Sequence, residues 1–185
     1  RSLQEGRSMS QKKRIAILGI GGVGGYYGGR LAKFYEGSAE VEIIFVARGA
    51  TAETLRNNGL RIITPESEEV SYPSLVASDP AEIGVVDVFV ICTKAYDLEE
   101  SMTKYRECIG AGTVVLPLLN GVNHAETIKK ILPQTEVWNG CAFIVSRIVS
   151  PGVIKVDSAI RLLQFGSFDG SIEKLQNFES ILKTA

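Results

Sequence analysis

The sequence is poor in the residues that bind metal ions and form disulfides. It contains one histidine and three cysteines in 185 residues, and Cys92, Cys108 and Cys141 form no C-x-x-C pair. An odd number of scattered cysteines argues against a disulfide framework and against a zinc site. We therefore expect no metal site, and we expect the cysteines to be small buried packing residues, with Cys92 at the end of an apolar strand.

An excess of charge and long apolar runs are also missing. The chain has 20 basic and 21 acidic side chains, a balance typical of soluble globular proteins rather than of nucleic-acid binders. It has no run of about 18 apolar residues that could cross a membrane. The opening residues 1–14 are polar and lack the apolar centre of a secretory signal. The sequence therefore predicts a cytoplasmic protein whose partners are neither nucleic acid nor membrane.

Residues 1–13 show no hydrophobic period, and the internal Met9 is a candidate natural start. We interpret this segment as a leader that is disordered or derived from a cloning vector. The residues that follow are numerous enough to bury the core of one domain.

Short apolar runs alternate with helical patterns over most of the chain. The runs typical of strands buried on both faces are 14–19, 41–47, 85–93, 113–118 and 136–145. Helical patterns cover 51–58, 98–108 and 123–132, and an earlier one is marked by Val23, Tyr27, Leu31 and Phe34. This alternation predicts a doubly wound α/β domain of the Rossmann type with a mostly parallel sheet.

Three segments depart from the alternation. Residues 60–74 predict two short strands or a hairpin, which ends before a turn at 78–80. No helix separates the apolar runs that come late in the chain, so we expect an antiparallel extension of the sheet from 141–149, 153–156 and 161–165. A final helix is expected over 171–184, with one apolar stripe formed by Ile172, Leu175, Phe178 and Leu182.

A glycine-rich loop joins the first predicted strand to the first helix. The run Gly19-Ile20-Gly21-Gly22-Val23-Gly24 fits G-x-G-x-x-G at the place where dinucleotide-binding loops occur. Gly19 would allow the tight turn, Gly21 would let a pyrophosphate approach, and Gly24 would let the helix pack on the strand. Free N–H groups at the helix start would face the phosphates. Gly28 and Gly29 lower the helix propensity, which indicates close packing against the sheet.

The end of the second strand indicates which dinucleotide is bound. An NAD site places an acidic residue there to accept from the ribose 2′-hydroxyl, whereas an NADP site places an arginine nearby. The chain has Val46-Ala47-Arg48-Gly49 and no acid. The Arg48 guanidinium can hold a 2′-phosphate by charge-assisted hydrogen bonds, and the alternative is a solvated surface arginine. The pattern therefore favours NADP (NADPH).

Two polar residues follow later strands, at the edge where an open parallel sheet binds its ligands. Lys94 could hold an anionic substrate group, and Asn120 could orient the nicotinamide or its ribose. Each has an ordinary alternative, a solvated loop lysine and the turn residue of an Asn-Gly pair. His124 comes next, at a helix start and without an identifiable acidic partner. We expect it to be a surface residue rather than a catalytic acid.

Together these motifs resemble the ketopantoate reductase family. The glycine loop, Arg48-Gly49, Thr93-Lys94-Ala95-Tyr96 and Asn120-Gly121-Val122 occur in the order and spacing of that family, and Phe165-Gly166 and Asp169-Gly170 resemble its segment before the interdomain linker. The resemblance covers residues 14–170, which would form the dinucleotide-binding domain, and 171–185 would begin the interdomain helix. It implies NADPH-dependent reduction of 2-dehydropantoate, a 2-oxo acid, to pantoate in pantothenate and coenzyme A biosynthesis.

The same resemblance assigns roles to individual residues. Gly19 to Gly24 would bind the phosphates, Arg48 the 2′-phosphate, and Lys94 and Asn120 would line the junction of cofactor and substrate. The segment 140–147 resembles a stretch whose backbone contacts the nicotinamide side, which points to Ser146.

The family's proton-donating lysine lies on a helix of an all-helical second domain that begins about where this chain ends. We therefore name no catalytic residue here and do not transfer that role to Lys174 or Lys183. The chain alone would bind cofactor and turn over poorly or not at all, with the helical C-terminal domain as its missing partner and a homodimer as one assembly open to the complete protein. Two alternatives stay open: a catalytically silent NADP-binding regulatory module, and a reductase of the same fold for another 2-oxo acid.

Overall fold

The computed structural model describes residues 11–121, 123–167 and 172–185. Most of the predicted leader, Val122 of the Asn-Gly-Val motif and the Asp169-Gly170 pair lie outside the described residues.

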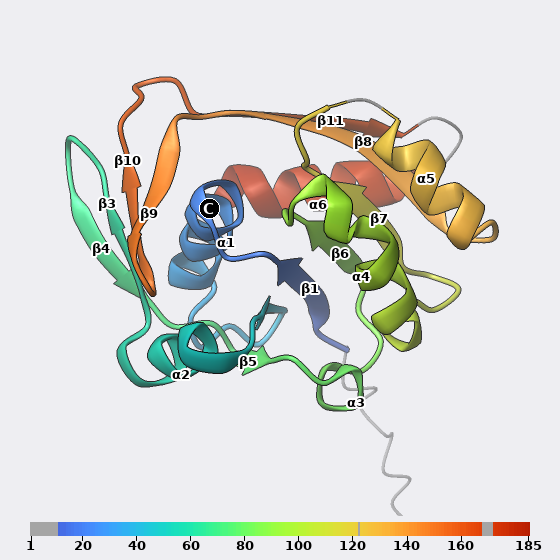
Figure 1. The fold of residues 1–185 in the computed structure, drawn as a ribbon, viewed down its shortest axis with the longest axis horizontal. Helices are drawn as coiled ribbons and strands as arrows, with labels where there is room; N and C mark the ends of the chain where they lie inside the picture. The colour runs from blue at the N-terminus through green and yellow to red at the C-terminus, as the bar shows by residue number, and fades with distance from the viewer. Residues whose placement is uncertain (1–10, 122, 168–171) are drawn as a thin grey trace, which may run out of the picture.

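A seven-stranded main sheet runs through the molecule (Figure 1), in the order β11-β8-β7-β6-β1-β2-β5. Its strands are β1 (Lys13–Leu18), β2 (Val41–Val46), β5 (Leu75–Ala77), β6 (Val88–Ile91), β7 (Val114–Pro117), β8 (Glu136–Phe143) and β11 (Leu162–Ser167). Neighbouring strands are parallel except for β11, which pairs antiparallel with β8. The predicted doubly wound sheet with an antiparallel extension is confirmed.

Helices cover both faces of the main sheet, because the strands carry apolar residues on both faces. The helices are α1 (Gly22–Phe34), α2 (Gly49–Asn58), α3 (Pro80–Ile83), α4 (Leu98–Lys104), α5 (His124–Ile131) and α6 (Ile172–Thr184), with 3₁₀ turns η1 (Ala95–Asp97) and η2 (Arg106–Cys108). Along β1, Ile15 and Ile17 belong to one buried cluster with α1, α2 and α6, and Ala16 belongs to the opposite cluster with α3, α4 and α5. This alternation is the signature of a parallel sheet buried on both faces.

A separate four-stranded sheet, called here the side sheet, lies on the face of the main sheet that α1, α2 and α6 cover. Its order is β4-β3-β10-β9, and its strands are β3 (Leu60–Ile63), β4 (Glu68–Ser71), β9 (Ser146–Ser150) and β10 (Val153–Val156). The predicted hairpin in 60–74 is therefore present, as β3 paired antiparallel with β4. The prediction that 141–156 extends the main sheet was wrong for β9 and β10, because β10 pairs in parallel with β3 instead.

Helix α1 makes three of the four apolar contacts that its sequence pattern predicted. Leu31 is buried and Val23 and Tyr27 are partly buried, but Phe34 is 50% exposed. Four of the buried positions on this helix are glycines, namely Gly24, Gly25, Gly28 and Gly29. The stripe expected on α6 is also incomplete, since Phe178 is buried but Ile172 is 70% exposed.

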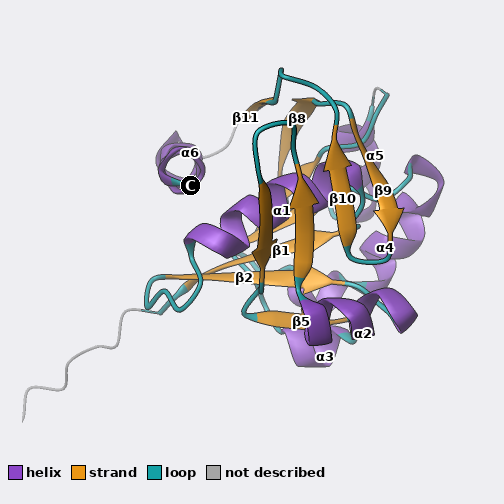
Figure 2. Ribbon diagram, turned by 90° about the vertical axis from the view of Figure 1, so that its left-hand side faces the viewer, coloured by secondary structure: helices purple, strands orange, loops and turns teal. Residues whose placement is uncertain are grey.

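The α1 glycines let the two sheets approach the same helix from different sides. A Cβ on Gly28 would lie 3.2 Å from the Phe45 ring of the main sheet, as the predicted close packing requires. A Cβ on Gly29 would lie 2.5 Å from Ile62 Cδ1 of the side sheet. Figure 2, viewed from that side, shows the strands of the side sheet crossing in front of α1. A larger residue at either position would force neighbouring side chains to move, so glycine allows the close approach of the layers.

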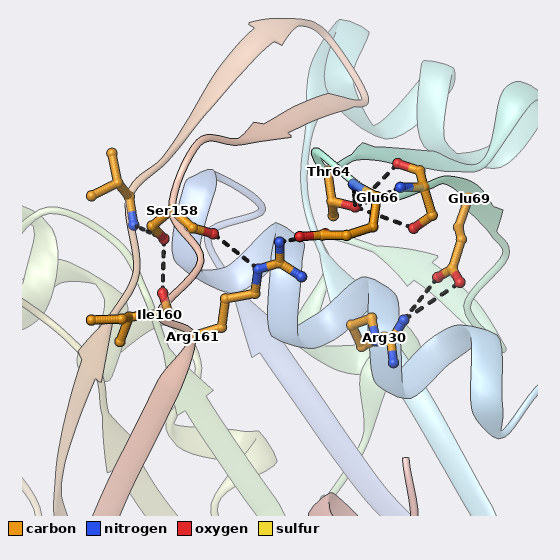
Figure 3. Close-up of polar contacts among 9 residues, drawn as sticks. Arg30, Thr64, Glu66, Glu69, Ser158, Ile160 and Arg161 are labelled. Carbon is orange, nitrogen blue, oxygen red and sulfur yellow. Dashed lines mark hydrogen bonds and ion pairs between the residues drawn. The ribbon is translucent and has the colours of Figure 1, made fainter.

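Arginine contacts tie the side sheet to the rest of the chain (Figure 3). Arg161, just before β11, donates to Glu66 Oε2 at 2.7 Å and to the Ser158 carbonyl at 3.2 Å. Arg30 of α1 donates to both carboxylate oxygens of Glu69, at 3.2 and 3.4 Å. The turn of the β3–β4 hairpin and the start of β4 are thus held by cations that come from other elements.

Two further sequence expectations concern exposure. Cys108 is buried as expected and Cys92 is partly buried, but Cys141 is exposed, because β8 leaves alternate residues uncovered where it pairs with β11. Among the described residues, no helix combines the length and the apolar character that crossing a membrane requires.

Candidate functional site

A cleft of about 420 Å³ opens at the carboxyl ends of β1, β2 and β6. This is the edge at which open parallel sheets bind ligands, and the volume lies within the usual range for small-molecule sites. Its floor and walls include the glycine loop from Gly19 to Gly21, the end of β2 with Arg48, and the end of β6 with Lys94. The fold therefore brings together three segments that were predicted separately.

The three glycines at the fixed positions of the G-x-G-x-x-G motif, Gly19, Gly21 and Gly24, meet different surroundings. Gly19 has φ of +90°, and a Cβ there would lie 2.8 Å from the Cys92 carbonyl carbon. A Cβ on Gly24 would lie 3.0 Å from the Cys92 Cβ, whereas one on Gly21 would meet only Ile148 Cδ1, at 3.8 Å. Gly19 and Gly24 are thus constrained by the protein itself, and Gly21 leaves open space beside the cleft.

The start of α1 offers unpaired backbone donors. The Gly25 N–H donates to the Gly21 carbonyl at 2.7 Å, and the capping residue Gly21 has no side chain to accept from the first turn. The first N–H groups of a helix have no acceptor within the helix, and they carry the positive end of its dipole. The loop can therefore hold an anion, although phosphate binding by Gly19 to Gly24, with Ile20, Gly22 and Val23 between them, stays a prediction.

Arg48 lies at the entrance to α2, on the wall of the cleft formed by β2. It is the N-terminal capping residue of that helix, and its side chain is exposed. No hydrogen bond or ion pair engages its guanidinium within residues 11–121, 123–167 and 172–185. Thr51 lies one turn further along α2 and also lines the cleft. This wall presents a free cation and a hydroxyl to a ligand.

The opposite wall comes from the residues that follow β6. The exposed Lys94 lines the cleft, with its Nζ 5.9 Å from the centre of the Tyr96 ring. Cys92 lies beneath the glycine loop, and burial raises the pKa of its thiol to about 12. The thiol therefore stays protonated and acts as a packing group rather than as a nucleophile.

Further cleft residues were not singled out from the sequence. One face of η1 and α4 lines the cleft with Asp97, Glu100, Ser101, Lys104 and Tyr105. Their helical spacing was a usable signal. Strand β9 adds Ile148, and the turn between β9 and β10 adds Pro151 and Gly152. No local signal could have placed that turn at the cleft, because its position depends on the pairing of β10 with β3.

Two predicted residues, Asn120 and Ser146, do not line this cleft. Asn120 is exposed after β7, and its carbonyl oxygen lies 2.8 Å from His124 Nε2. His124 begins α5, as expected of a helix-start residue. Ser146 begins β9 and sits on the glycine loop, where a Cβ on Gly22 would lie 2.6 Å from its Oγ. The roles of Asn120 and Ser146 toward the nicotinamide stay predictions.

The chain is similar to one protein family over most of its length. The family model described as ketopantoate reductase PanE/ApbA matches residues 15–170.

Among individual relatives, an oxidoreductase of Bacillus subtilis (strain 168), YkpB, described as uncharacterized, is 34% identical over 158 residues, which are 85% of this chain and 50% of that protein. A 2-dehydropantoate 2-reductase of Lactococcus lactis subsp. lactis is 30% identical over 168 residues, covering 90% of this chain and 49% of that protein. The crystal structure of 2-dehydropantoate 2-reductase from Porphyromonas gingivalis W83 superposes with a TM-score of 0.88 at 39% identity, covering 94% of this chain and 62% of that one. The chain thus spans about half the length of the curated relatives it matches.

Proposed function

We propose that this chain, which belongs to the ketopantoate reductase PanE/ApbA family, is the NADPH-binding half of an oxidoreductase that reduces 2-dehydropantoate to pantoate. A nicotinamide dinucleotide is the cofactor that reductases of this family require. The proposal therefore concerns which dinucleotide is bound, which residues hold it, and which 2-oxo acid is reduced.

The observation that carries the choice of NADPH is the unpaired Arg48 at the end of β2. The guanidinium lines the cleft and has no anionic partner within the described parts of the chain. No acidic residue occupies the wall formed by β2 and the start of α2, where an NAD site would need one. A 2′-phosphate would supply the missing partner, and the Thr51 hydroxyl could donate to the same phosphate.

The residues of the cleft fit the remaining parts of a dinucleotide. The open space beside Gly21 and the free N–H groups of α1 suit a pyrophosphate. Lys94 would attract the anionic substrate or the cofactor phosphates from the opposite wall. When bound, the cofactor supplies the hydride that passes to the keto carbon of the substrate, while the protein positions the two reactants.

The substrate and the domain arrangement are part of the same proposal. Residues 14–170 would form the dinucleotide-binding domain and α6 would begin the helix that leads into a second, helical domain. By its resemblance to the family, that domain would supply the proton donor to the substrate oxygen. We place the reaction in the cytoplasm, as pantothenate biosynthesis implies.

A calorimetric titration with NADPH and NADH tests the choice of cofactor. The unchanged chain should prefer NADPH, and Arg48→Ala should weaken NADPH binding by about 10- to 100-fold, as the loss of hydrogen bonds to a charged group predicts. NADH binding should change little. Arg106→Ala is the matched control, since Arg106 is exposed and lies outside the cleft. Equal affinities for both dinucleotides in the unchanged chain would refute the assignment of Arg48.

The substrate is tested with the second domain present. The chain mixed with the C-terminal half of the P. gingivalis homologue should oxidise NADPH when 2-dehydropantoate is added, and the chain by itself should do so slowly or not at all. Oxidation with another 2-oxo acid but none with 2-dehydropantoate would show that the family fold is used for a different substrate.

A further inference from the structure

A buried hydroxyl group without a hydrogen-bond partner can indicate that a ligand binds beside it. In residues 11–121, 123–167 and 172–185, four buried side-chain oxygens have no hydrogen-bond partner, those of Tyr27, Ser71, Thr93 and Ser146. Of these four residues, Thr93 is the one that lines the cleft. A buried polar group left unpaired is unfavourable and needs an explanation in a native structure.

We propose that the Thr93 hydroxyl is a positioning group for the cofactor, which donates a hydrogen bond to the pyrophosphate of the bound dinucleotide. The inference rests on the proposed function and adds a contact to it. The sequence placed Thr93 in the motif Thr93-Lys94-Ala95-Tyr96, but it assigned a role only to Lys94.

The backbone holds Thr93 directly beside the glycine loop. Strands β1 and β6 are neighbours, with Leu18 opposite Ile91, and the Cys92 N–H donates to the Leu18 carbonyl at 2.8 Å. As a result, a Cβ on Gly19 would lie 2.9 Å from the Thr93 nitrogen. Thr93 is therefore fixed against the first residue of the loop that would bind the phosphates.

The strand order decides which part of the cofactor the hydroxyl can reach. Because β1 lies between β2 and β6, Arg48 and Thr93 flank the glycine loop from opposite sides. Arg48 would hold the 2′-phosphate of the adenosine ribose, and the loop itself would hold the pyrophosphate. Since the Thr93 backbone lies against this loop, its hydroxyl is matched to the pyrophosphate, whose charged oxygens make strong acceptors.

Two substitutions separate the hydroxyl from the shape of the side chain. Thr93→Val keeps nearly the same shape and removes the hydroxyl, and Thr93→Ser keeps the hydroxyl. We expect Thr93→Val to bind NADPH about tenfold more weakly, as loss of a hydrogen bond to a charged group predicts. Thr93→Ser should bind within about threefold of the unchanged chain. If Thr93→Val folds poorly, Thr93→Ala removes the same hydroxyl and should show the same loss.

The melting temperature of Thr93→Val without cofactor distinguishes a cofactor contact from a purely structural role. A structural role of the hydroxyl predicts that this temperature falls. Removal of an unpaired buried hydroxyl should leave the melting temperature of Thr93→Val unchanged or raise it, while the extra stabilisation by NADPH shrinks. A fall in melting temperature without cofactor, with no change in the NADPH affinity, would overturn the inference.

A fragment of the cofactor localises the contact. Adenosine 2′-monophosphate carries the 2′-phosphate but no pyrophosphate, so its binding in competition assays should be the same for Thr93→Val and the unchanged chain. Equal losses for the fragment and for NADPH, or equal losses for Thr93→Val and Thr93→Ser, would each contradict a pyrophosphate contact.

If the unchanged chain binds NADPH but Thr93→Val binds it equally well, only this inference fails. If the unchanged chain binds no dinucleotide, the proposed function fails as well.

Discussion

The two sheets of this molecule are assembled in different ways. Most parallel strands of the main sheet are short apolar runs linked by helices, and these runs can be recognised from their own residues. The three-residue edge strand β5 is the exception, since it follows β4 without a helix and was not predicted. The side sheet joins β3 and β4, from residues 60–71, to β9 and β10, from residues 146–156, and its β9 strand is almost fully exposed. The main sheet is thus specified locally, whereas the side sheet exists because distant segments meet on α1.

This difference matters for the cleft. The ends of the main-sheet strands supply the glycine loop, Arg48 and Lys94. The side sheet supplies the β9–β10 turn, whose Pro151 and Gly152 also line the cleft. The lining of the cleft therefore depends in part on a sheet whose position is not encoded in any single segment. Three substitutions test how firmly the two sheets are joined.

The largest effect is expected where the side sheet enters the common core. Ile154 of β10 is 1% exposed and belongs to the same buried cluster as Ile17 of β1. Ile154→Ala should lower the free energy of unfolding by about 2–5 kcal/mol, because it leaves a cavity in that core. Urea unfolding followed by two probes should stay a single transition.

Ile17→Ala is the matched control in the main sheet, and its cost should be of the same order. A separate, earlier transition in Ile154→Ala that leaves the main sheet intact would mean that the side sheet folds as an independent unit.

A smaller effect is expected at the contact between α1 and the side sheet. Gly29→Val would place side-chain atoms where Ile62 and Leu60 already lie, so we expect a loss of about 1–3 kcal/mol from overpacking. Gly21→Ala is the control, since a Cβ there meets only Ile148 at ordinary contact distance. If thermal unfolding shows no larger loss for Gly29→Val than for Gly21→Ala, contact with the side sheet does not explain the glycine at position 29.

The smallest effect is expected at the ion pair between Arg161 and Glu66. The hydrogen bond from Arg161 lowers the pKa of the Glu66 carboxyl below its ordinary value of 4.5. A lowered pKa stabilises the folded state above the ordinary pKa, and this stabilisation is lost as the pH falls through the lowered value. Glu66 is exposed to solvent, so the contribution is small.

The pH dependence of the melting temperature measures this contribution. Glu66→Gln should melt slightly below the unchanged chain at neutral pH, and the difference should vanish in acid. Arg161→Ala should remove the same contribution, and a difference that persists well below pH 4.5 would show that the pair acts through packing instead of charge.

The main sheet and much of the candidate site could be predicted from the sequence. The alternation of apolar runs and helical patterns is a local property, and the glycine loop, Arg48 and Lys94 each follow a strand directly. The carboxyl ends of parallel strands meet at one edge whatever the rest of the fold does. Residues defined in that way are brought together in the cleft.

Other features could not be obtained from the chain alone. The apolar pattern of α1 predicted contacts for Phe34, yet the helix is packed through its glycines because a second sheet approaches it. Asn120 and Ser146 were predicted as site residues from their resemblance to family motifs, but neither lines the cleft.

The amino-acid sequence by itself determined the strand–helix alternation, the glycine loop and the cation at the end of β2, since each depends on neighbours along the chain. The tertiary structure decided where β9 and β10 pair, which glycines are needed on α1, and that the Thr93 hydroxyl is buried without a partner in the described residues beside the loop. These features depend on contacts between segments far apart in the sequence, and such contacts leave no periodic signal in either segment.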